Sequence, residues 1–226
     1  TKDIQDEILE ANTEMSSKAL RVIGTAYKKV SADFDPEDPD SIESGMVFLG
    51  LTGMIDPPRP EVKTAIEECR QAGITTVMIT GDQRATAVAI AKEVGIITSE
   101  SDLIVNGEDF TTLTDYELKE KIHRIKVYSR MDPKDKYRVV ETLQELGYIV
   151  AVTGDGINDA PALRKADIGV AMGITGTDVS KEVSDMVITD DAFNTIVNAV
   201  EEGRTIFNNM KKFIRYALSA NFDEIF

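Results

Sequence analysis

Short apolar runs alternate with longer amphipathic stretches along most of this chain, and the alternation predicts its elements. The expected helices cover residues 61–72, 84–94, 115–122, 134–146, 160–164 and 178–183. The expected strands cover residues 74–79, 103–105, 126–129, 148–152, 168–172 and 186–188. Strands that alternate with helices of this length are typical of βαβ units. The pattern therefore predicts an α/β fold with a Rossmann-like, mostly parallel sheet flanked by helices.

The two ends of the chain depart from this alternation. A polar helical pattern over 1–19 and an apolar strand over 20–27 lead into an acidic segment, 31–44, that carries Pro36 and Pro39. Such a segment is typical of an exposed connection between domains. A further strand is expected over 46–51. We therefore expect three parts, divided as 1–44, 45–190 and 191–226.

The last part is a single long helical pattern with apolar residues at helical spacing. Two interpretations remain open for it: a C-terminal helix packed on the sheet, or a stalk that continues toward a membrane. Its final stretch, 213–226, becomes apolar but carries Arg215, Asp223 and Glu224. No stretch reaches the roughly 20 apolar residues that span a bilayer.

The amino-acid composition argues against several classes of function. The chain has 226 residues, 40 acidic against 25 basic, and a net charge of -15. This balance argues against nucleic acid as a partner, because neutralising phosphates needs a basic surface. Cys69 is the only cysteine, so the chain forms no internal disulfide, which fits a reducing compartment. With His123 as the only histidine, neither a histidine-based triad nor a zinc site is expected.

The most informative stretch is 151–163, which reads A-V-T-G-D-G-I-N-D-A-P-A-L. A buried strand is expected to lead into it, and the glycines around Asp155 allow a sharp turn that leaves this carboxylate at the strand's carboxyl end. Asn158 and Asp159 follow closely. Oxygen-bearing side chains at such an edge suit a hard cation such as Mg2+. The alternative is an Asx-rich turn that only links strand to helix.

Two further polar positions are expected at the same edge of the sheet. Thr80, Gly81 and Asp82 follow the strand over 74–79, and a hydroxyl with free N–H groups at a helix start can bind phosphate. Lys136, early in its helix, could neutralise a phosphoryl oxygen. Together with the carboxylates, these groups match the needs of phosphoryl transfer. A nucleophile is missing, because no aspartate stands at a strand end in a D-x-[ST]-G-T or D-x-D-x-T setting.

Several strings resemble the catalytic region of P-type cation-transporting ATPases, which belong to the haloacid-dehalogenase-like phosphotransferases. They are D-P-P-R at 56–59, M-I-T-G-D at 78–82, the D-P-K-x-K segment that ends at Lys136, T-G-D-G-I-N-D-A-P-A-L at 153–163, and the segment from Asp190 through Lys211. The wording T-G-D-Q-R-A-T-A is more similar to Ca2+ pumps than to Na+/K+ pumps. The resemblance covers almost the whole chain.

This resemblance implies a role for each matching residue. Asp155 and Asp159 would hold Mg2+, with Asn158 in the network around metal and phosphate. Thr80, Gly81 and Lys136 would bind the phosphoryl group, and Asp82 would order that loop and contact either the nucleotide, ATP, or the hinge. The resemblance also implies that Asp56 and Arg59 belong to the hinge between domains, and that Arg21 contacts ATP phosphates.

The resemblance also implies what lies outside this chain. Residues 1–44 would be the end of a nucleotide-binding domain, 45–190 a phosphorylation domain without its nucleophile strand, and 191–226 a helix leading toward a transmembrane segment. The phosphorylated aspartate would lie upstream, so the chain alone is expected to be inactive. Its partners would be the other domains of a membrane-embedded pump, ATP and a cation bound elsewhere, with this part on the cytoplasmic side. The alternatives are a soluble phosphatase of the same superfamily and a non-catalytic regulatory domain.

Overall fold

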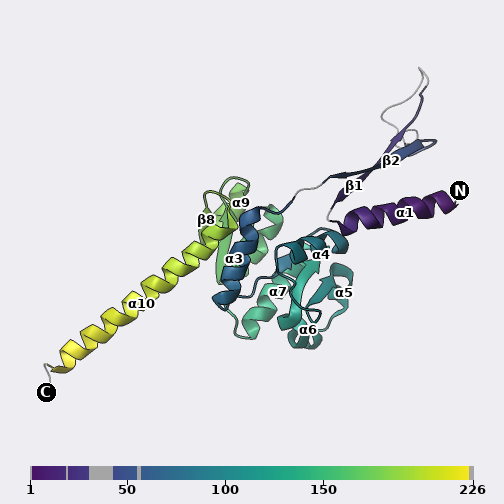
Figure 1. Ribbon diagram of the computed structural model, residues 1–226. Coiled ribbons are helices and arrows are strands. Elements are labelled where there is room, and N and C mark those ends of the chain that lie inside the picture. The colour runs from purple at the N-terminus through teal and green to yellow at the C-terminus, as the bar shows by residue number, and fades with distance from the viewer. Residues whose placement is uncertain (1, 19, 31–42, 55–56, 224–226) are drawn as a thin grey trace.

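The computed structural model describes residues 2–18, 20–30, 43–54 and 57–223, and its elements follow the predicted alternation (Figure 1). The α-helices are α1 (Lys2–Ser17), α3 (Pro60–Gln71), α4 (Arg84–Glu93), α5 (Gly107–Thr112), α6 (Asp115–Lys121), α7 (Pro133–Glu145), α8 (Ala160–Lys165), α9 (Asp178–Val183) and α10 (Phe193–Asp223). The strands are β1 (Arg21–Tyr27), β2 (Val47–Met54), β3 (Met78–Ile79), β4 (Leu103–Asn106), β5 (Ile125–Ser129), β6 (Ala151–Gly154), β7 (Ile168–Met172) and β8 (Met186–Ile188). Short 3-10 turns η1 (Ile122–Arg124) and η2 (Ile157–Asp159) complete the order.

The parallel strands form two sheets of three in the described part of the chain, with orders β3-β5-β4 and β6-β7-β8. All of their pairings are parallel, and helices flank them (Figure 1). The predicted α/β class with a parallel, helix-flanked arrangement is therefore confirmed. In the described residues the parallel strands are divided between two sheets, and β3 and β6 are both edge strands.

Two strands differ from their predicted bounds for the same physical reason. The strand expected over 74–79 is reduced to Met78–Ile79, and the one expected over 148–152 is displaced to Ala151–Gly154. Each has one hydrogen-bonded neighbour, so residues beyond the paired segment have nothing to fix them as strand. On β6 the unpartnered edge leaves apolar surface in solvent, with Ile149 just before it 81% exposed.

Packing between helices and sheet explains why the elements form where they do. The main core is built on β5, where Tyr128 packs edge-on against Phe110 at 5.8 Å between ring centroids. The helix α5, which the sequence pattern did not predict, supplies Phe110. Its first residue must be glycine because a Cβ at Gly107 would collide with the main-chain oxygen of Arg130.

The first strands form a separate antiparallel pair, β1 with β2, beside α1 (Figure 1). Large apolar side chains on this pair stay exposed, among them Leu49 at 63%. The acidic segment 31–44 lies mostly outside the described residues, so the expected division into 1–44, 45–190 and 191–226 stays a prediction.

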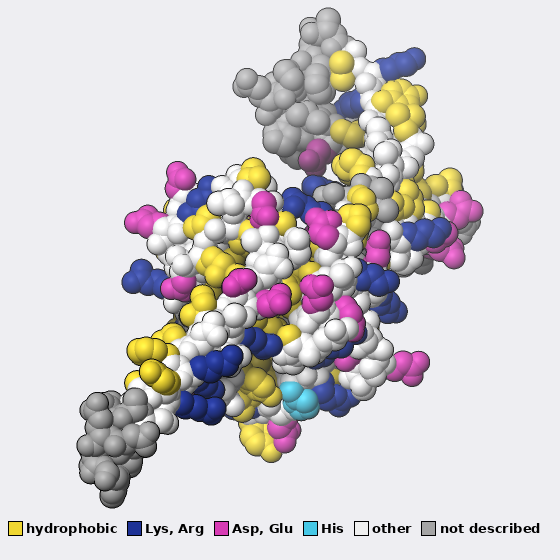
Figure 2. All heavy atoms as spheres, turned by 60° about the vertical axis from the view of Figure 1, so that its left-hand side comes forward, with side chains coloured by type: hydrophobic (Ala, Val, Ile, Leu, Met, Phe, Trp, Pro, Cys, Tyr) yellow, Lys and Arg dark blue, Asp and Glu magenta, His cyan; other side chains and the backbone are white. Residues whose placement is uncertain are grey.

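The long helix α10 packs on the body through its first part only. Residues 193–200 are mostly half-buried and contact α3, whereas residues 201–216 are exposed. Figure 2 shows hydrophobic side chains gathered on this projecting part, where Phe213 is 69% exposed. The helix is therefore not packed along the sheet over its whole length. Among the described residues, none of the helices is both long and apolar enough to cross a membrane.

Candidate functional site

The Thr80 loop is fixed at the carboxyl edge of the first parallel sheet. The Thr80 N–H donates to the Tyr128 oxygen at 2.9 Å, and the Met131 N–H donates to the Thr80 oxygen at 3.1 Å. The Arg130 N–H donates to the Asp82 oxygen at 3.1 Å. The loop is thus held on the segment that follows β5. Gly81 is exposed, and a Cβ at this position would meet no atom within 4 Å, so the loop faces open space.

The Thr80 side chain is arranged to donate a hydrogen bond. Its Oγ1 accepts from the Asp82 N–H at 3.1 Å, which orders the turn. The hydroxyl hydrogen has no other partner in the described residues and can be directed at a bound anion. A hydroxyl therefore stands beside a glycine with an open approach, and the phosphate-binding role of this pair stays a prediction.

The Lys136 side chain extends from α7 to the turn that follows β6 of the second sheet. It lies near the start of α7, which begins after Asp132 with Pro133 in the first turn, a position that suits proline because its missing N–H would be unpaired anyway. The Lys136 Nζ lies 2.5 Å from Asp159 Oδ1, and the two side chains are only 21% and 13% exposed. The ion pair is therefore partly shielded from solvent and links α7 to the turn after β6.

Asp159 has a partner on each carboxylate oxygen. While Oδ1 receives Lys136, Oδ2 accepts the Gly156 N–H at 3.1 Å. The carboxylate packs so closely on the strand end that a Cβ at Gly154 would lie 2.5 Å from the Asp159 Cβ. This close approach explains why the first residue of the G-D-G turn, Gly154, is a glycine. In this arrangement Asp159 orders the loop and orients Lys136.

Asp155 presents the free carboxylate of the site. Its side chain is exposed and makes no hydrogen bond or ion pair with any described residue. Its main chain is fixed instead, because the Asp155 oxygen accepts the Thr177 N–H at 2.8 Å and the Ser180 hydroxyl at 3.2 Å. Ser180 is fully buried. A rigid backbone with an uncommitted carboxylate is the arrangement that a cation ligand needs.

The residues fit Mg2+ through Asp155 alone. Within the described ranges there is no group of three or more histidine, cysteine or acidic side chains that could enclose a metal. Mg2+ typically takes one or two carboxylates and completes its shell with water and substrate phosphate, so a single free carboxylate is compatible with it. The predicted metal role of Asp159 stays a prediction, since both of its oxygens already have partners. Asn158 is exposed beside them.

Two of the predicted residues, Arg21 and Arg59, lie apart from this group. Arg21 begins β1 in the separate antiparallel pair, and it makes no hydrogen bond or ion pair with Thr80, Lys136 or Asp155. Asp56 lies outside the described residues. Arg59, which precedes α3, donates from Nη1 to the main-chain oxygen of Asp191 at 3.0 Å, at the start of α10. The nucleotide and hinge roles of these residues stay predictions.

One residue at the site was not predicted. Arg130 has a left-handed backbone, with a φ of 51°, and its N–H holds Asp82. A cavity of about 210 Å3 opens beside it, lined by Gln83, Arg84, Ala85, Asn106 and Arg130. The side-chain oxygen of Asn106 is buried there without a partner. Arg130 stands two residues before the D-P-K segment, but only the fold brings it to the Thr80 loop.

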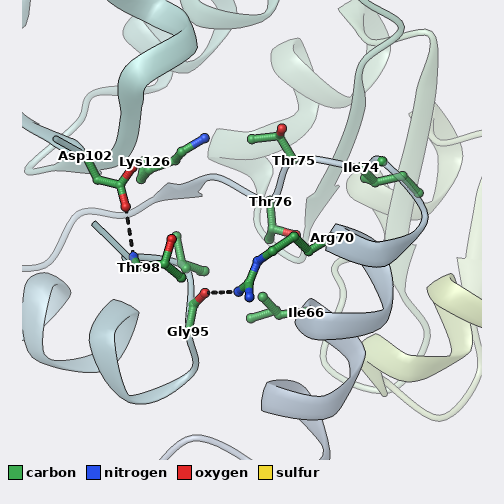
Figure 3. A pocket seen from close by; sticks show the side chains of 11 residues that line it. Ile66, Arg70, Ile74, Thr75, Thr76, Gly95, Thr98, Asp102 and Lys126 are labelled. Atoms are coloured by element: carbon green, nitrogen blue, oxygen red, sulfur yellow. Dashed lines mark hydrogen bonds between the residues drawn. The ribbon is translucent and has the colours of Figure 1, made fainter. Parts of the chain in front are cut away.

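A larger cavity lies elsewhere in the described part of the chain and is not part of this site. It measures about 370 Å3 and opens at the amino ends of the strands, between α3 and the turn before β4 (Figure 3). Its two cations are already balanced: Arg70 bonds Glu67 and the Gly95 oxygen, and Lys126 acts on the carboxylate of Asp102. Hydrogen bonds from Thr98 and Ser99 lower the pKa of Asp102 despite its partial burial. Nothing in this cavity calls for a ligand.

The fold and this edge site define the class of protein, and the comparison with known families agrees. The family profile of the haloacid dehalogenase-like hydrolases matches residues 4–167. The chain belongs to that family.

Named relatives narrow the comparison further. The chain is 51% identical to a calcium-transporting ATPase 1 of Bacillus cereus over 225 residues, which is 100% of this chain and 25% of that protein. It is 47% identical to an endoplasmic reticulum-type calcium-transporting ATPase 2 of Arabidopsis thaliana over 98% of this chain and 23% of that protein. It is 44% identical to the endoplasmic reticulum calcium ATPase srcA of Aspergillus fumigatus over 100% of this chain and 24% of that protein. The chain thus spans about a quarter of the length of these relatives.

Proposed function

We propose that this chain is the phosphorylation-domain segment of an ATP-driven cation pump of the P-type, with Ca2+ as the transported ion. The observation that carries the proposal is the free Asp155 carboxylate beside the shielded Lys136–Asp159 pair, at one edge of a parallel α/β fold. The relatives named as calcium-transporting ATPases support the choice of ion. The pump would be a membrane protein with this segment on the cytoplasmic side.

The division of labour at the site follows from the contacts. Thr80 and the open Gly81 N–H would receive the phosphoryl oxygens, because this loop faces open space and is fixed from behind. Lys136, oriented by Asp159, would offset the charge that develops on the transferred group. Asp155 would ligate Mg2+, which screens charge on the phosphate when it is bound.

The nucleophile would come from outside this chain. The two parallel sheets end on β3 and β6, whose outer edges have no strand beside them in the described residues. A strand placed between β3 and β6 would complete one sheet and bring its carboxyl end next to Thr80 and Asp155. We place the phosphorylated aspartate on that strand, in the part of the pump that precedes residue 1.

ATP would approach over the Thr80 loop. The cavity beside Arg130 adjoins this loop and carries two arginines, Arg84 and Arg130, which suit a phosphate or a ribose hydroxyl. The Arg130 N–H donates to the Asp82 oxygen, so the loop is connected to the wall of the cavity. Arg21 and Asp82 would add nucleotide contacts, and Asp56 and Arg59 would form the hinge.

The test is formation of a phosphoenzyme by the complete pump in membranes. Labelled ATP and Mg2+ are added with and without Ca2+, the reaction is quenched in acid, and the trapped label is treated with hydroxylamine. We expect an acid-stable, hydroxylamine-labile product that requires Ca2+. Asp155→Asn should abolish it, whereas Asp109→Asn, which changes an exposed side chain on α5, should not.

Other outcomes separate the alternatives. A phosphoenzyme that forms without Ca2+ and responds to another ion would keep the mechanism and discard the ion. Absence of phosphoenzyme under every ion, with steady release of phosphate from p-nitrophenyl phosphate, would indicate a phosphatase. Absence of both would indicate a regulatory domain.

A further inference from the structure

A short connector, residues 173–177, joins the candidate metal ligand to the start of α10. At one end the Thr177 N–H donates to the Asp155 main-chain oxygen at 2.8 Å. At the other end the Asp191 carboxylate accepts the Ile174 N–H at 2.9 Å and the Thr175 N–H at 2.8 Å. The Thr175 hydroxyl adds a third hydrogen bond at 2.8 Å. Asp155 and Asp191 are therefore held by opposite ends of one segment.

The connector is closely packed against neighbouring main chain at its two glycines. A Cβ at Gly173 would lie 2.5 Å from the Ile188 oxygen, and one at Gly176 would collide with the Met172 oxygen. The Gly173 N–H is also bonded to the Ile188 oxygen at 2.7 Å. Although Ile174 and Thr175 are exposed, each of these glycines brings the connector directly against neighbouring main chain, which limits how far it can deform at these two points.

Asp191 is itself held in an uncommon conformation at the junction. Its φ is 51°, a left-handed value that aspartate and asparagine tolerate better than most residues. Its main-chain oxygen accepts Arg59 Nη1, so the start of α3 also bears on this point. The neighbouring Asp190 has a different task, since it accepts the Ala192 N–H and the Thr195 hydroxyl at the beginning of α10.

We propose that Asp191 is a positioning residue that couples the start of α10 to the geometry of the Asp155 loop through the connector 173–177. When α10 shifts, the Asp191 carboxylate carries the connector with it, and the Thr177 N–H displaces the Asp155 backbone. By linkage, a cation bound at Asp155 stabilises one position of α10 to the same extent that α10 favours cation binding. The part that concerns the cation rests on the proposed function; the mechanical coupling does not.

The first experiment measures the coupling without any reaction. Amide hydrogen exchange is followed in the 226-residue chain and in Asp191→Asn, which keeps the size and the left-handed tolerance of the side chain but removes its charge. Losing charge-assisted hydrogen bonds should speed exchange at Ile174 and Thr175 about tenfold. The proposal requires exchange at Thr177 to rise several-fold as well.

Matched variants keep this result interpretable. Asp190→Asn should speed exchange at Ala192 and leave Thr177 unchanged. Thr175→Val removes only the hydroxyl contact and should increase exchange at Thr177 by a smaller factor than Asp191→Asn does. It replaces Asp191→Asn if that variant folds poorly. The amide of Val127 in the core serves as the reference for global unfolding. An unchanged Thr177 amide, or an equal rise at Thr177 and Val127, would overturn the proposal.

The second experiment tests the consequence for the site in the complete pump. In Asp191→Asn the Mg2+ concentration for half-maximal phosphorylation should rise several-fold while the maximal level is retained, and in Asp190→Asn it should stay unchanged. A fall in the maximal level with an unaltered Mg2+ requirement would overturn the link to the cation. If no phosphoenzyme forms in the unmodified pump, the proposed function is wrong. The hydrogen-exchange experiment still tests the mechanical coupling, because it does not depend on the reaction.

Discussion

The Lys136–Asp159 ion pair joins the two halves of the site. Its coupling energy follows from the distance between the charges and from their exposure to solvent. The Nζ–Oδ1 distance is 2.5 Å, and neither side chain is more than 21% exposed. With an effective dielectric constant of about 20, two unit charges at this separation attract by roughly 6 to 7 kcal/mol. Removing both groups from water costs several kcal/mol, so a net coupling of about 2 kcal/mol remains.

The prediction is an asymmetry between single and double variants. Lys136→Met leaves the Asp159 carboxylate shielded from water without its cation, and should lower the free energy of unfolding by about 2 to 3 kcal/mol. Asp159→Asn should cost about as much, because the amide cannot balance the ammonium. The double variant removes both charges and should be about 2 kcal/mol more stable than the sum of the single losses implies.

The assay is urea unfolding of the four proteins at neutral pH, followed by circular dichroism and analysed as a double-mutant cycle. Lys165→Met, which breaks the more exposed pair with Glu141, is the matched control and should cost under about 1 kcal/mol. A coupling energy below about 0.5 kcal/mol would refute the reasoning, since it would place the pair in the class of solvated surface contacts. The predicted orientation of Lys136 by Asp159 would then have no energetic basis.

Three further predictions concern other parts of the fold. Gly107→Ala should lower the free energy of unfolding by at least about 2 kcal/mol, because the new methyl group would collide with the Arg130 oxygen; thermal unfolding measures this, and a neutral result would contradict the close packing. Arg138→Met should cost about 2 kcal/mol in the same measurement, since the guanidinium bonds the Phe110 oxygen and lies 5.2 Å from that ring's centroid. Hydrogen bonds from the main chain of the 174–175 turn lower the pKa of Asp191 to about 2, so its contribution to stability is complete above about pH 5 and is lost as the pH falls toward 2. The stability difference between the unmodified chain and Asp191→Asn should therefore shrink between pH 5 and pH 2, and a constant difference would show that the carboxylate is not the cause.

The elements that the sequence predicts well are those that carry their own signal. Strand β7 was predicted over its full length, because its apolar run is bounded on both sides and it has a neighbour on each edge. The Asp155 turn and Lys136 were recognisable for a similar reason: glycines and a proline-led helix start constrain the backbone locally. Local patterns of this kind survive in a single sequence.

The features that the sequence did not predict depend on partners distant in the chain. Helix α5 is only 6 residues long, too short for a periodic pattern, and it forms because Phe110 packs on β5. The place of Arg130 at the Thr80 loop follows from pairing between β3 and β5, which the order of elements does not reveal. The contact of Asp159 Oδ1 with Lys136 likewise appears only when α7 meets η2, whereas Oδ2 accepts a local hydrogen bond from Gly156.

The residues of the candidate site are divided between two sheets. The Thr80 loop and Arg130 belong to the sheet of β3, while Asp155 belongs to the sheet of β6. Across the division the ion pair of Lys136 with Asp159 is joined by contacts of α7 with α8, among them the Gln144 hydrogen bond to the Lys165 oxygen. A strand that pairs with β3 and β6 at once would add main-chain hydrogen bonds to these side-chain contacts. The proposed nucleophile strand would therefore also tie the phosphate-binding half to the metal-binding half. The start of α10 bears on the Asp155 half through the connector, and it also packs on α3, the helix that precedes β3.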